Sequence, residues 1–176
     1  MKAVYRYGYE PRQYEFRDMP DPTCGPEDVI IEVKYAAICG SDVATYFNGG
    51  EKGGICIVGH EFAGTVVQVG SQVSDWKPGD RVVSDNTGHV CGKCHACTSG
   101  LFLNCMERVA LGYGMDGGFA KYVKIPGEIL RIHKWALMRI PDGVPYEYAA
   151  ILDPICNAYK AVAQESGLRP GESAIV

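Results

Sequence analysis

The chain has 176 residues, of which 47% are hydrophobic, and a net charge of -4 from 17 basic and 21 acidic side chains. This composition is that of a folded protein with a full hydrophobic core, and its interspersed charges offer no cationic surface for nucleic acid or anionic lipid. No apolar run approaches the roughly 20 residues that span a bilayer, and the N-terminus lacks the layout of a signal peptide. We therefore expect a cytoplasmic protein that acts on small molecules, without nucleic-acid or membrane partners.

Short segments rich in β-branched and aromatic residues dominate the first 140 residues. Glycine, proline, aspartate or serine bounds each segment, which is typical of strands joined by turns. The predicted strands cover residues 29–35, 62–69, 81–83 and 120–125. This pattern indicates a mainly β fold, a compact barrel with long loops.

The pattern changes at Tyr146, after which small and apolar residues recur at helical spacing. We predict helical segments that are broken or kinked near Pro154 and end at Gly167. A turn over residues 169–173 then precedes Ala174-Ile175-Val176, which we predict to begin a further strand.

The glycines at positions 112, 114 and 117 have the spacing G-x-G-x-x-G. That spacing binds a dinucleotide only where a strand precedes it and a helix N-terminus follows. Here residues 118–125 have the composition of a strand, so the helix is missing. We interpret the glycines as a loop before a strand.

Four of the eight cysteines follow the spacing C-x2-C-x2-C-x7-C: Cys91, Cys94, Cys97 and Cys105. Without a secretion signal, clustered cysteines indicate metal or thiol chemistry more than a disulfide framework. Four thiolates this close together can wrap a tetrahedral zinc ion, and a closed shell of this kind has a structural role. We expect His89 and His95 to be surface residues outside this shell.

A second set of possible ligands is dispersed along the chain. Cys39 and His60 could each be an ordinary core residue, and Asp153 could be a helix cap. Together, however, a thiol, an imidazole and a carboxylate form a metal site with one place left for water or substrate. Such an open site is catalytic.

The motifs together resemble the zinc-containing alcohol dehydrogenases of the medium-chain dehydrogenase/reductase superfamily. The stretch from Gly59-His60-Glu61 to Val73 is similar to the signature of that family. The supporting motifs, in the family's order, are Cys39-Gly-Ser-Asp42, Lys77-Pro-Gly-Asp80-Arg-Val82, the four-cysteine lobe, Asp116-Gly-Gly-Phe-Ala-Lys-Tyr-Val123 and Asp153-Pro154. The acidic residue before Pro154 makes the chain most similar to the polyol (sorbitol) and threonine dehydrogenase branch.

This resemblance implies a catalytic zinc in addition to the structural one. Its ligands would be Cys39 and His60, with Glu61 as a ligand or a supporting carboxylate. Asp153 stands where this branch usually has glutamate; its side chain is one methylene shorter, and direct coordination is expected.

The resemblance also implies how protons move. Ser41 matches the hydroxyl that accepts the substrate proton, and Asp42 matches the carboxylate that orients a ligand. Many relatives have a histidine within the segment that reads Val43-Ala44-Thr45 here, so any onward relay must use another group or water. The loop around Tyr113 and Met115 and the run 46–49 could shape the substrate pocket, although simple loop packing explains them equally well.

The implied fold is a GroES-like β-barrel catalytic domain over residues 1–145, with the structural zinc lobe at 88–106. Residues 146–176 would be an inter-domain helix and the first strand of a Rossmann domain that the chain lacks. We expect NAD or NADP to be the cofactor of the full-length enzyme, which would be a homo-oligomer, either a dimer or a tetramer. The chain alone would then be inactive.

The alternative function is a non-enzymatic zinc module that uses the four-cysteine lobe for protein contacts. A quinone reductase or lyase of the same superfamily is disfavoured, because quinone reductases generally lack both zinc constellations. We therefore expect a zinc-dependent oxidoreductase that interconverts a secondary alcohol, polyol or amino alcohol and its ketone.

Overall fold

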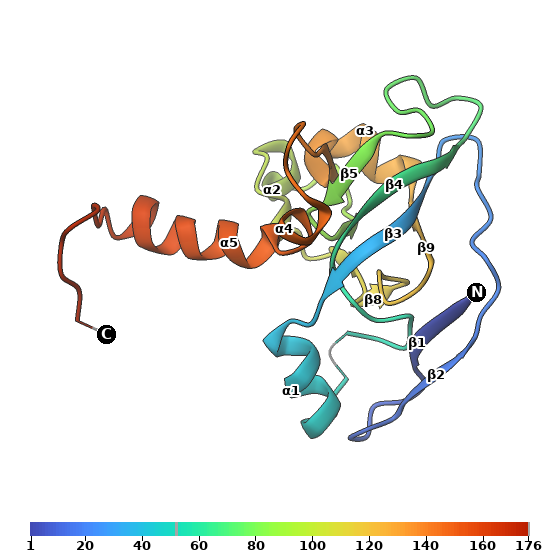
Figure 1. Cartoon of the computed structure of the whole chain (residues 1–176), viewed down its shortest axis with the longest axis horizontal. Helices are drawn as coiled ribbons and strands as arrows, with labels where there is room; N and C mark the ends of the chain where they lie inside the picture. Colours follow the sequence, from blue (N-terminus) through green and yellow to red (C-terminus); the bar gives the residue numbers. More distant parts are fainter. Residues whose placement is uncertain (52, 176) are drawn as a thin grey trace.

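The computed structural model describes residues 1–51 and 53–175, and it confirms the mainly β architecture (Figure 1). Its strands are β1 (Lys2–Arg6), β2 (Tyr14–Asp18), β3 (Val29–Ala37), β4 (Glu61–Val69), β5 (Arg81–Ser84), β6 (Thr87–His89), β7 (Val109–Leu111), β8 (Gly114–Met115), β9 (Tyr122–Ile125) and β10 (Leu137–Arg139). Its helices are α1 (Gly40–Asn48), α2 (His95–Thr98), α3 (Gly127–Ile132), α4 (Tyr146–Ala150) and α5 (Leu152–Tyr159). Short 3-10 turns cover Phe102–Asn104 and Lys134–Ala136, and a π-helical segment covers Lys160–Glu165.

The central sheet has five antiparallel strands in the order β10-β5-β4-β3-β9. Smaller sheets pair β1 with β2, and β6 with β7 and β8. Apolar side chains of the central strands form the main core, in which Val29, Ile31, Phe62, Val66, Val82, Val123 and Ile125 are buried. The β-branched residues that predicted the strands therefore also supply many of the side chains buried in the core.

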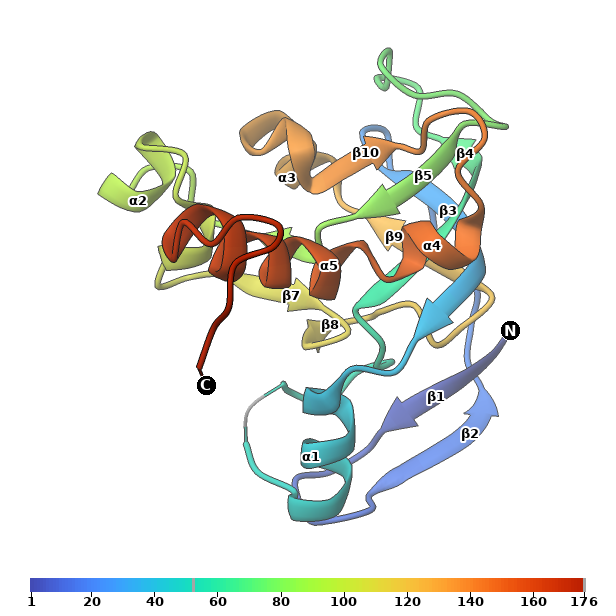
Figure 2. The same cartoon turned by 60° about the vertical axis from the view of Figure 1, so that its left-hand side comes forward.

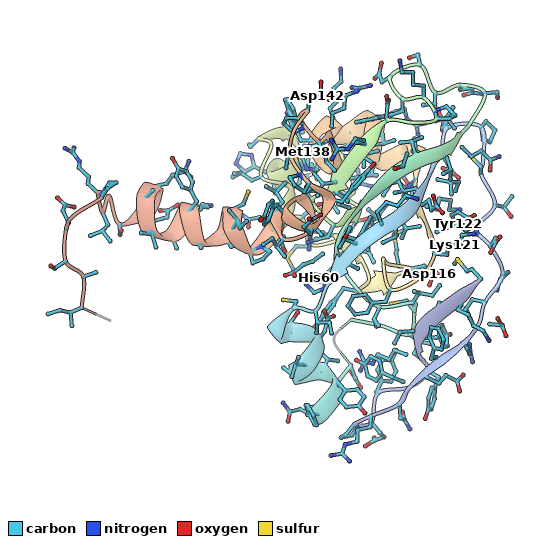
Figure 3. The ribbon with its side chains drawn as sticks, viewed as in Figure 1. His60, Asp116, Lys121, Tyr122, Met138 and Asp142 are labelled. Atoms are coloured by element: carbon cyan, nitrogen blue, oxygen red, sulfur yellow. The ribbon has the colours of Figure 1, made fainter. Side chains whose placement is uncertain are left out.

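The pairing of β3 with β4 determines where the predicted ligands meet. In this antiparallel pair Ala37 lies opposite Glu61, so the end of β3 adjoins the start of β4. Cys39 is the residue before α1 at the end of β3, and His60 immediately precedes β4. Figure 3 shows His60 at the junction between the central sheet and α1.

The glycine-rich loop leads into a strand, as expected, because β9 follows it. Gly112 and Gly117 pack against the backbone of Gly59, so that a Cβ on Gly117 would lie 2.2 Å from the Gly59 carbonyl oxygen. Gly118 donates a backbone hydrogen bond to the same oxygen at 2.7 Å. Gly112, Gly117 and Gly118 therefore support the backbone beside His60, and the strand that follows gives the glycine spacing no phosphate-binding context.

The C-terminal part differs in detail from the sequence prediction. The break predicted near Pro154 falls three residues earlier, at Ile151, between α4 and α5. Pro154 lies in the first turn of α5, where its missing N–H group is not needed for helical hydrogen bonding. Gly167 follows the last helical segment with a φ of 70°, as a helix stop requires.

The strand predicted at residues 174–176 is not formed by Ala174 and Ile175, and Val176 lies outside the described residues. A strand needs a neighbour to accept and donate its hydrogen bonds. Figure 1 shows α5 projecting from the body of the molecule, and Figures 1 and 2 both show the terminal segment away from the central sheet. The domain boundary at residue 145 stays a prediction. In the described ranges, none of the helices has the length and apolar character needed to cross a membrane.

We predict that Gly117→Ala lowers the free energy of unfolding by about 1–3 kcal/mol, because its Cβ would collide with the backbone of Gly59. Gly40→Ala is the control, since open space surrounds that position in the first turn of α1. It should leave stability unchanged or raise it by up to about 1 kcal/mol. Urea unfolding of both variants measures the difference, and equal stabilities would contradict the packing role of Gly117.

Candidate metal centres

The four predicted lobe cysteines come together in the structure. The sulfur atoms of Cys91, Cys94, Cys97 and Cys105 lie within 4.8 Å of one another. The Cys91 and Cys97 sulfurs are 3.9 Å apart, and backbone N–H groups of Cys91 and Cys94 point at the sulfurs of Cys105 and Cys91, each at 3.4 Å. Cys97 and Cys105 are buried and belong to the main core.

The environment of this cluster favours a bound cation. Backbone N–H groups of Lys93 and Cys94 lower the pKa of Cys91 to about 7. Burial and the neighbouring thiols raise the pKa of Cys97 to about 12. Without a metal, one thiol of the cluster loses its proton easily while another keeps it. A divalent metal would keep all four sulfurs deprotonated at once. The donor set therefore fits a tetrahedral zinc ion.

The two nearby histidines lie outside this cluster. His95 is exposed, in agreement with the sequence interpretation. His89 is half-buried, with its Nδ1 atom 3.6 Å from a Glu128 carboxylate oxygen, because β6 packs beside α3. The prediction that His89 is a surface residue is thus only partly correct.

A second cluster contains Cys39, His60 and Glu61, whose ligand atoms also lie within 4.8 Å of one another. His60 and Glu61 are 8% and 4% exposed, and Cys39 is half-buried. A carboxylate as buried as that of Glu61 costs free energy unless a cation compensates it. Thiol, imidazole and carboxylate are also the donors that zinc accepts, so the residues present fit that metal.

Asp42 contacts two members of the second cluster, Cys39 and His60. One of its carboxylate oxygens accepts the Cys39 backbone N–H at 3.0 Å, and the other lies 3.5 Å from His60 Nδ1. The second contact is long for a hydrogen bond, and Nδ1 is buried without an aligned partner. The Asp42 carboxylate raises the pKa of His60 to about 9 in spite of burial. A metal that binds the imidazole must displace its proton.

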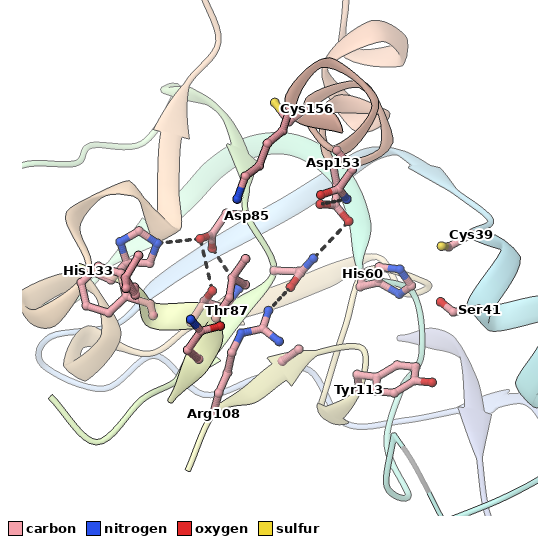
Figure 4. A pocket seen from close by; sticks show the side chains of 18 of the residues that line it. Cys39, Ser41, His60, Asp85, Thr87, Arg108, Tyr113, His133, Asp153 and Cys156 are labelled. Atoms are coloured by element: carbon pink, nitrogen blue, oxygen red, sulfur yellow. Dashed lines mark hydrogen bonds and ion pairs between the residues drawn. The ribbon is translucent and has the colours of Figure 1, made fainter. Parts of the chain in front are cut away.

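Cys39 and His60 line one wall of a cavity of about 760 Å³ (Figure 4). The exposed Ser41 and the half-buried Tyr113 line the same wall. The Tyr113 ring meets His60 edge-on, with centroids 6.1 Å apart, and its hydroxyl lies 3.3 Å from Thr45 Oγ1. Tyr113 thus contributes to the pocket, whereas Met115 packs against the core and Tyr46 packs against Tyr14 and Phe47.

Asp153 lies in this cavity but not in the cluster of Cys39, His60 and Glu61. Its Oδ2 atom accepts a hydrogen bond from Asn86 Nδ2 at 3.4 Å, and its Oδ1 atom accepts one from Asn157 Nδ2 at 3.2 Å. The structure therefore assembles three of the four expected ligands. Direct coordination by Asp153 stays a prediction.

The sequence did not identify two residues that are hydrogen-bonded to Asp153 directly or through one another. Asn86 donates to it, and Arg108 Nη2 in turn donates to Asn86 Oδ1 at 2.6 Å. Both line the cavity, although they lie 67 and 45 positions before Asp153. Neither belongs to a motif or a periodic pattern, so no local signal could have identified them.

The comparisons with known proteins agree with this geometry. Residues 25–135 match the alcohol dehydrogenase GroES-like domain. The chain belongs to this family. The resemblance to zinc-containing alcohol dehydrogenases inferred from the sequence is confirmed, as is the fold that it implied.

Relatives of this alcohol dehydrogenase domain include an uncharacterised zinc-type alcohol dehydrogenase-like protein, YdjL, of Escherichia coli (strain K12). The two are 56% identical over 180 residues, covering 100% of this chain and 50% of YdjL. A sorbitol dehydrogenase of Halalkalibacterium halodurans is 36% identical, covering 100% and 49%. The crystal structure of an NAD-dependent alcohol dehydrogenase superposes with a TM-score of 0.80 at 30% identity, covering 98% and 49%. The chain thus spans about half the length of these proteins.

We predict that Cys94→Ser removes one zinc ion per chain from this alcohol dehydrogenase domain and lowers its Tm. Because the lobe sulfurs are part of the core, losing that metal should cost about 3 kcal/mol, which for a chain of this size is ~10 °C. Cys156→Ser is the matched control, since Cys156 is exposed and outside both clusters. Elemental analysis and calorimetry are the measurements; unchanged zinc content in Cys94→Ser would rule out the lobe as a zinc site.

Proposed function

We propose that this chain is the zinc-binding catalytic part of an NAD(P)-linked dehydrogenase that interconverts a secondary alcohol, polyol or amino alcohol and its ketone. The observation that carries the proposal is the buried cluster of Cys39, His60 and Glu61 at one wall of a cavity large enough for a small polar substrate. The members of the four-cysteine cluster would hold a second, structural zinc.

Cys39, His60 and Glu61 would hold the catalytic zinc, which would supply the Lewis acidity that lowers the pKa of an alcohol. One thiolate and one carboxylate balance the two charges of such an ion. With Cys39 and Glu61 bound, the net charge of the metal site would be close to zero. Such a site admits an anionic oxygen without binding it too tightly.

Ser41 is the group we assign to proton transfer, because it is exposed on the cavity wall beside Cys39 and His60. Its hydroxyl would accept the alcohol proton at Oγ. Asp42 would fix the His60 ring and the Cys39 backbone through its two oxygens. The tyrosine ring at position 113 would close the pocket edge next to His60 and exclude water from it.

Relatives support the substrate class and the cofactor class. Their names include sorbitol dehydrogenase and L-threonine 3-dehydrogenase, which point to polyols and amino alcohols. Solved structures of similar proteins are bound to NADP in one case and NADH in another, so we infer a nicotinamide cofactor as the hydride acceptor. Cytoplasmic location and a homo-oligomeric state are predictions from the sequence alone.

We expect two zinc ions per chain in the purified protein, and one in the His60→Ala variant. In a protein that carries this chain together with a nucleotide-binding domain, His60→Ala should reduce alcohol-dependent NADH formation to background, because the metal and the orienting contact with Asp42 are both lost. His95→Ala is the control, since His95 is exposed and outside both clusters. Full activity in His60→Ala would refute the proposed site.

A further inference from the structure

Arg108 carries a positive charge that no carboxylate of the described residues balances. It directly precedes β7 and is half-buried. Its Nη2 atom donates to Asn86 Oδ1, which is a neutral acceptor. Within the part of the chain that the structure describes, Nη1 has no hydrogen-bond partner and Nε is buried without one. Because a guanidinium stays protonated in proteins, partial burial without a counter-charge costs free energy.

Two contacts hold Arg108 in place before any ligand binds. Its backbone N–H donates to the Cys105 carbonyl at 3.1 Å, and Cys105 is buried in the main core. Asn86, which accepts from Nη2, is 8% exposed, and its backbone N–H donates to Ser84 Oγ at 3.0 Å. The guanidinium is therefore preorganised, so a ligand would bind it without first ordering a flexible side chain.

Arg108 lines the same cavity as Cys39 and His60 (Figure 4). The volume of about 760 Å³ lies within the roughly 300–1,000 Å³ that is typical of small-molecule sites. Lys160 is a second cation of the cavity lining. Its Nζ atom lies 3.8 Å from a Glu165 oxygen, but both side chains are exposed, and exposed pairs of this kind are weak. One cavity thus joins a candidate metal site to two positive charges.

The carboxylates that line this cavity have other partners. Asp85 accepts two hydrogen bonds from Thr87, and its Oδ2 atom lies 2.6 Å from His133 Nε2. Asp153 is the expected fourth ligand of the catalytic metal, and its oxygens accept hydrogen bonds from two amide side chains. Neither carboxylate forms an ion pair with Arg108. The positive charge of Arg108 therefore remains for a ligand to balance.

We propose that Arg108 binds a phosphate ester group of the substrate, which makes the substrate a phosphorylated polyol. A planar guanidinium matches the geometry of phosphate oxygens. A phosphate monoester carries about −1.5 to −2 charges at pH 7, which Arg108 and Lys160 together would balance, whereas a carboxylate would balance one of them. This inference rests on the proposed function, because it places a hydroxyl of the same substrate at the cluster of Cys39, His60 and Glu61.

The pyrophosphate of a nicotinamide cofactor offers the same oxygens, so the test must separate the two sources. The probes are sorbitol, sorbitol 6-phosphate, gluconate, inorganic phosphate and NADH, each titrated by calorimetry into the zinc-loaded 176-residue chain. Arg108→Met removes the charge, and Cys39→Ser disables the metal cluster. Arg169→Met is the matched control, since Arg169 is exposed and outside the cavity.

We expect sorbitol 6-phosphate to bind about tenfold or more tightly than sorbitol, gluconate or inorganic phosphate, because it alone combines the hydroxyls with a phosphate. Arg108→Met should weaken sorbitol 6-phosphate about 10- to 100-fold, the range of a hydrogen bond to a charged group. The same variant should bind sorbitol and NADH as before and keep its zinc, which shows that it is folded. Arg169→Met should match the unmodified chain with every probe.

Equal affinities for sorbitol and sorbitol 6-phosphate in the unmodified chain would overturn the inference without reliance on any variant. Gluconate that binds as tightly as sorbitol 6-phosphate would overturn it, and so would a dependence on Arg108 that only NADH shows. Sorbitol 6-phosphate binding that depends on Arg108 but not on Cys39 would instead overturn the proposed function, while the phosphate site itself would stand.

Discussion

The antiparallel pairing of β3 with β4 is the interaction on which the candidate site depends. It places Ala37 opposite Glu61, and so brings Cys39, the residue before α1, next to His60, the residue before β4. Twenty-one positions of sequence separate Cys39 from His60, yet the sheet register brings their ligand atoms within 4.8 Å. Sliding the register by one residue would direct Glu61 to the other face of the sheet and dismantle the cluster. The same hydrogen bonds therefore stabilise the fold and assemble the ligands.

The four-cysteine lobe contacts the rest of the structure through two of its cysteines and through one aromatic ring. Cys97 and Cys105 are part of the main core, together with Val90. Phe102 stacks on His133 at a centroid distance of 4.2 Å, and His133 Nε2 lies 2.6 Å from Asp85 Oδ2. A metal in the lobe would thus stabilise more than its own loop, since ordering the sulfurs also orders side chains that pack on the sheet.

The sequence predicted what depends on local pattern. Segments rich in β-branched and aromatic residues identified β3, β4, β5 and β9, and spacing alone identified the four cysteines whose sulfur atoms cluster. Cys39 and His60 needed the resemblance to a family, because either residue in isolation is compatible with an ordinary core position. The helix break predicted near Pro154 falls three residues before it, at Ile151, because proline disrupts a helix interior but is tolerated in a first turn.

What escaped prediction depends on contacts between distant segments. Tyr113 lines the cavity and packs closely on Gly53, which has no side chain. A Cβ at position 53 would lie 3.1 Å from the nearest atom of the Tyr113 ring. Asn86 and Arg108 matter because the turn between β5 and β6 meets both the lobe and α5. Side-chain bonds of this kind leave no periodic trace in a sequence.

The turn between β5 and β6 accordingly has two roles, carried by adjacent residues. Asp85 connects it, through His133, to the ring of Phe102 in the lobe, and Asn86 connects it to Asp153 at the cavity. Asn86 bonds to the charged side chains of Arg108 and Asp153, and hydrogen bonds to ionised groups are stronger than those between neutral groups. Through these contacts one short turn joins the four-cysteine lobe to the cavity that Cys39 and His60 line.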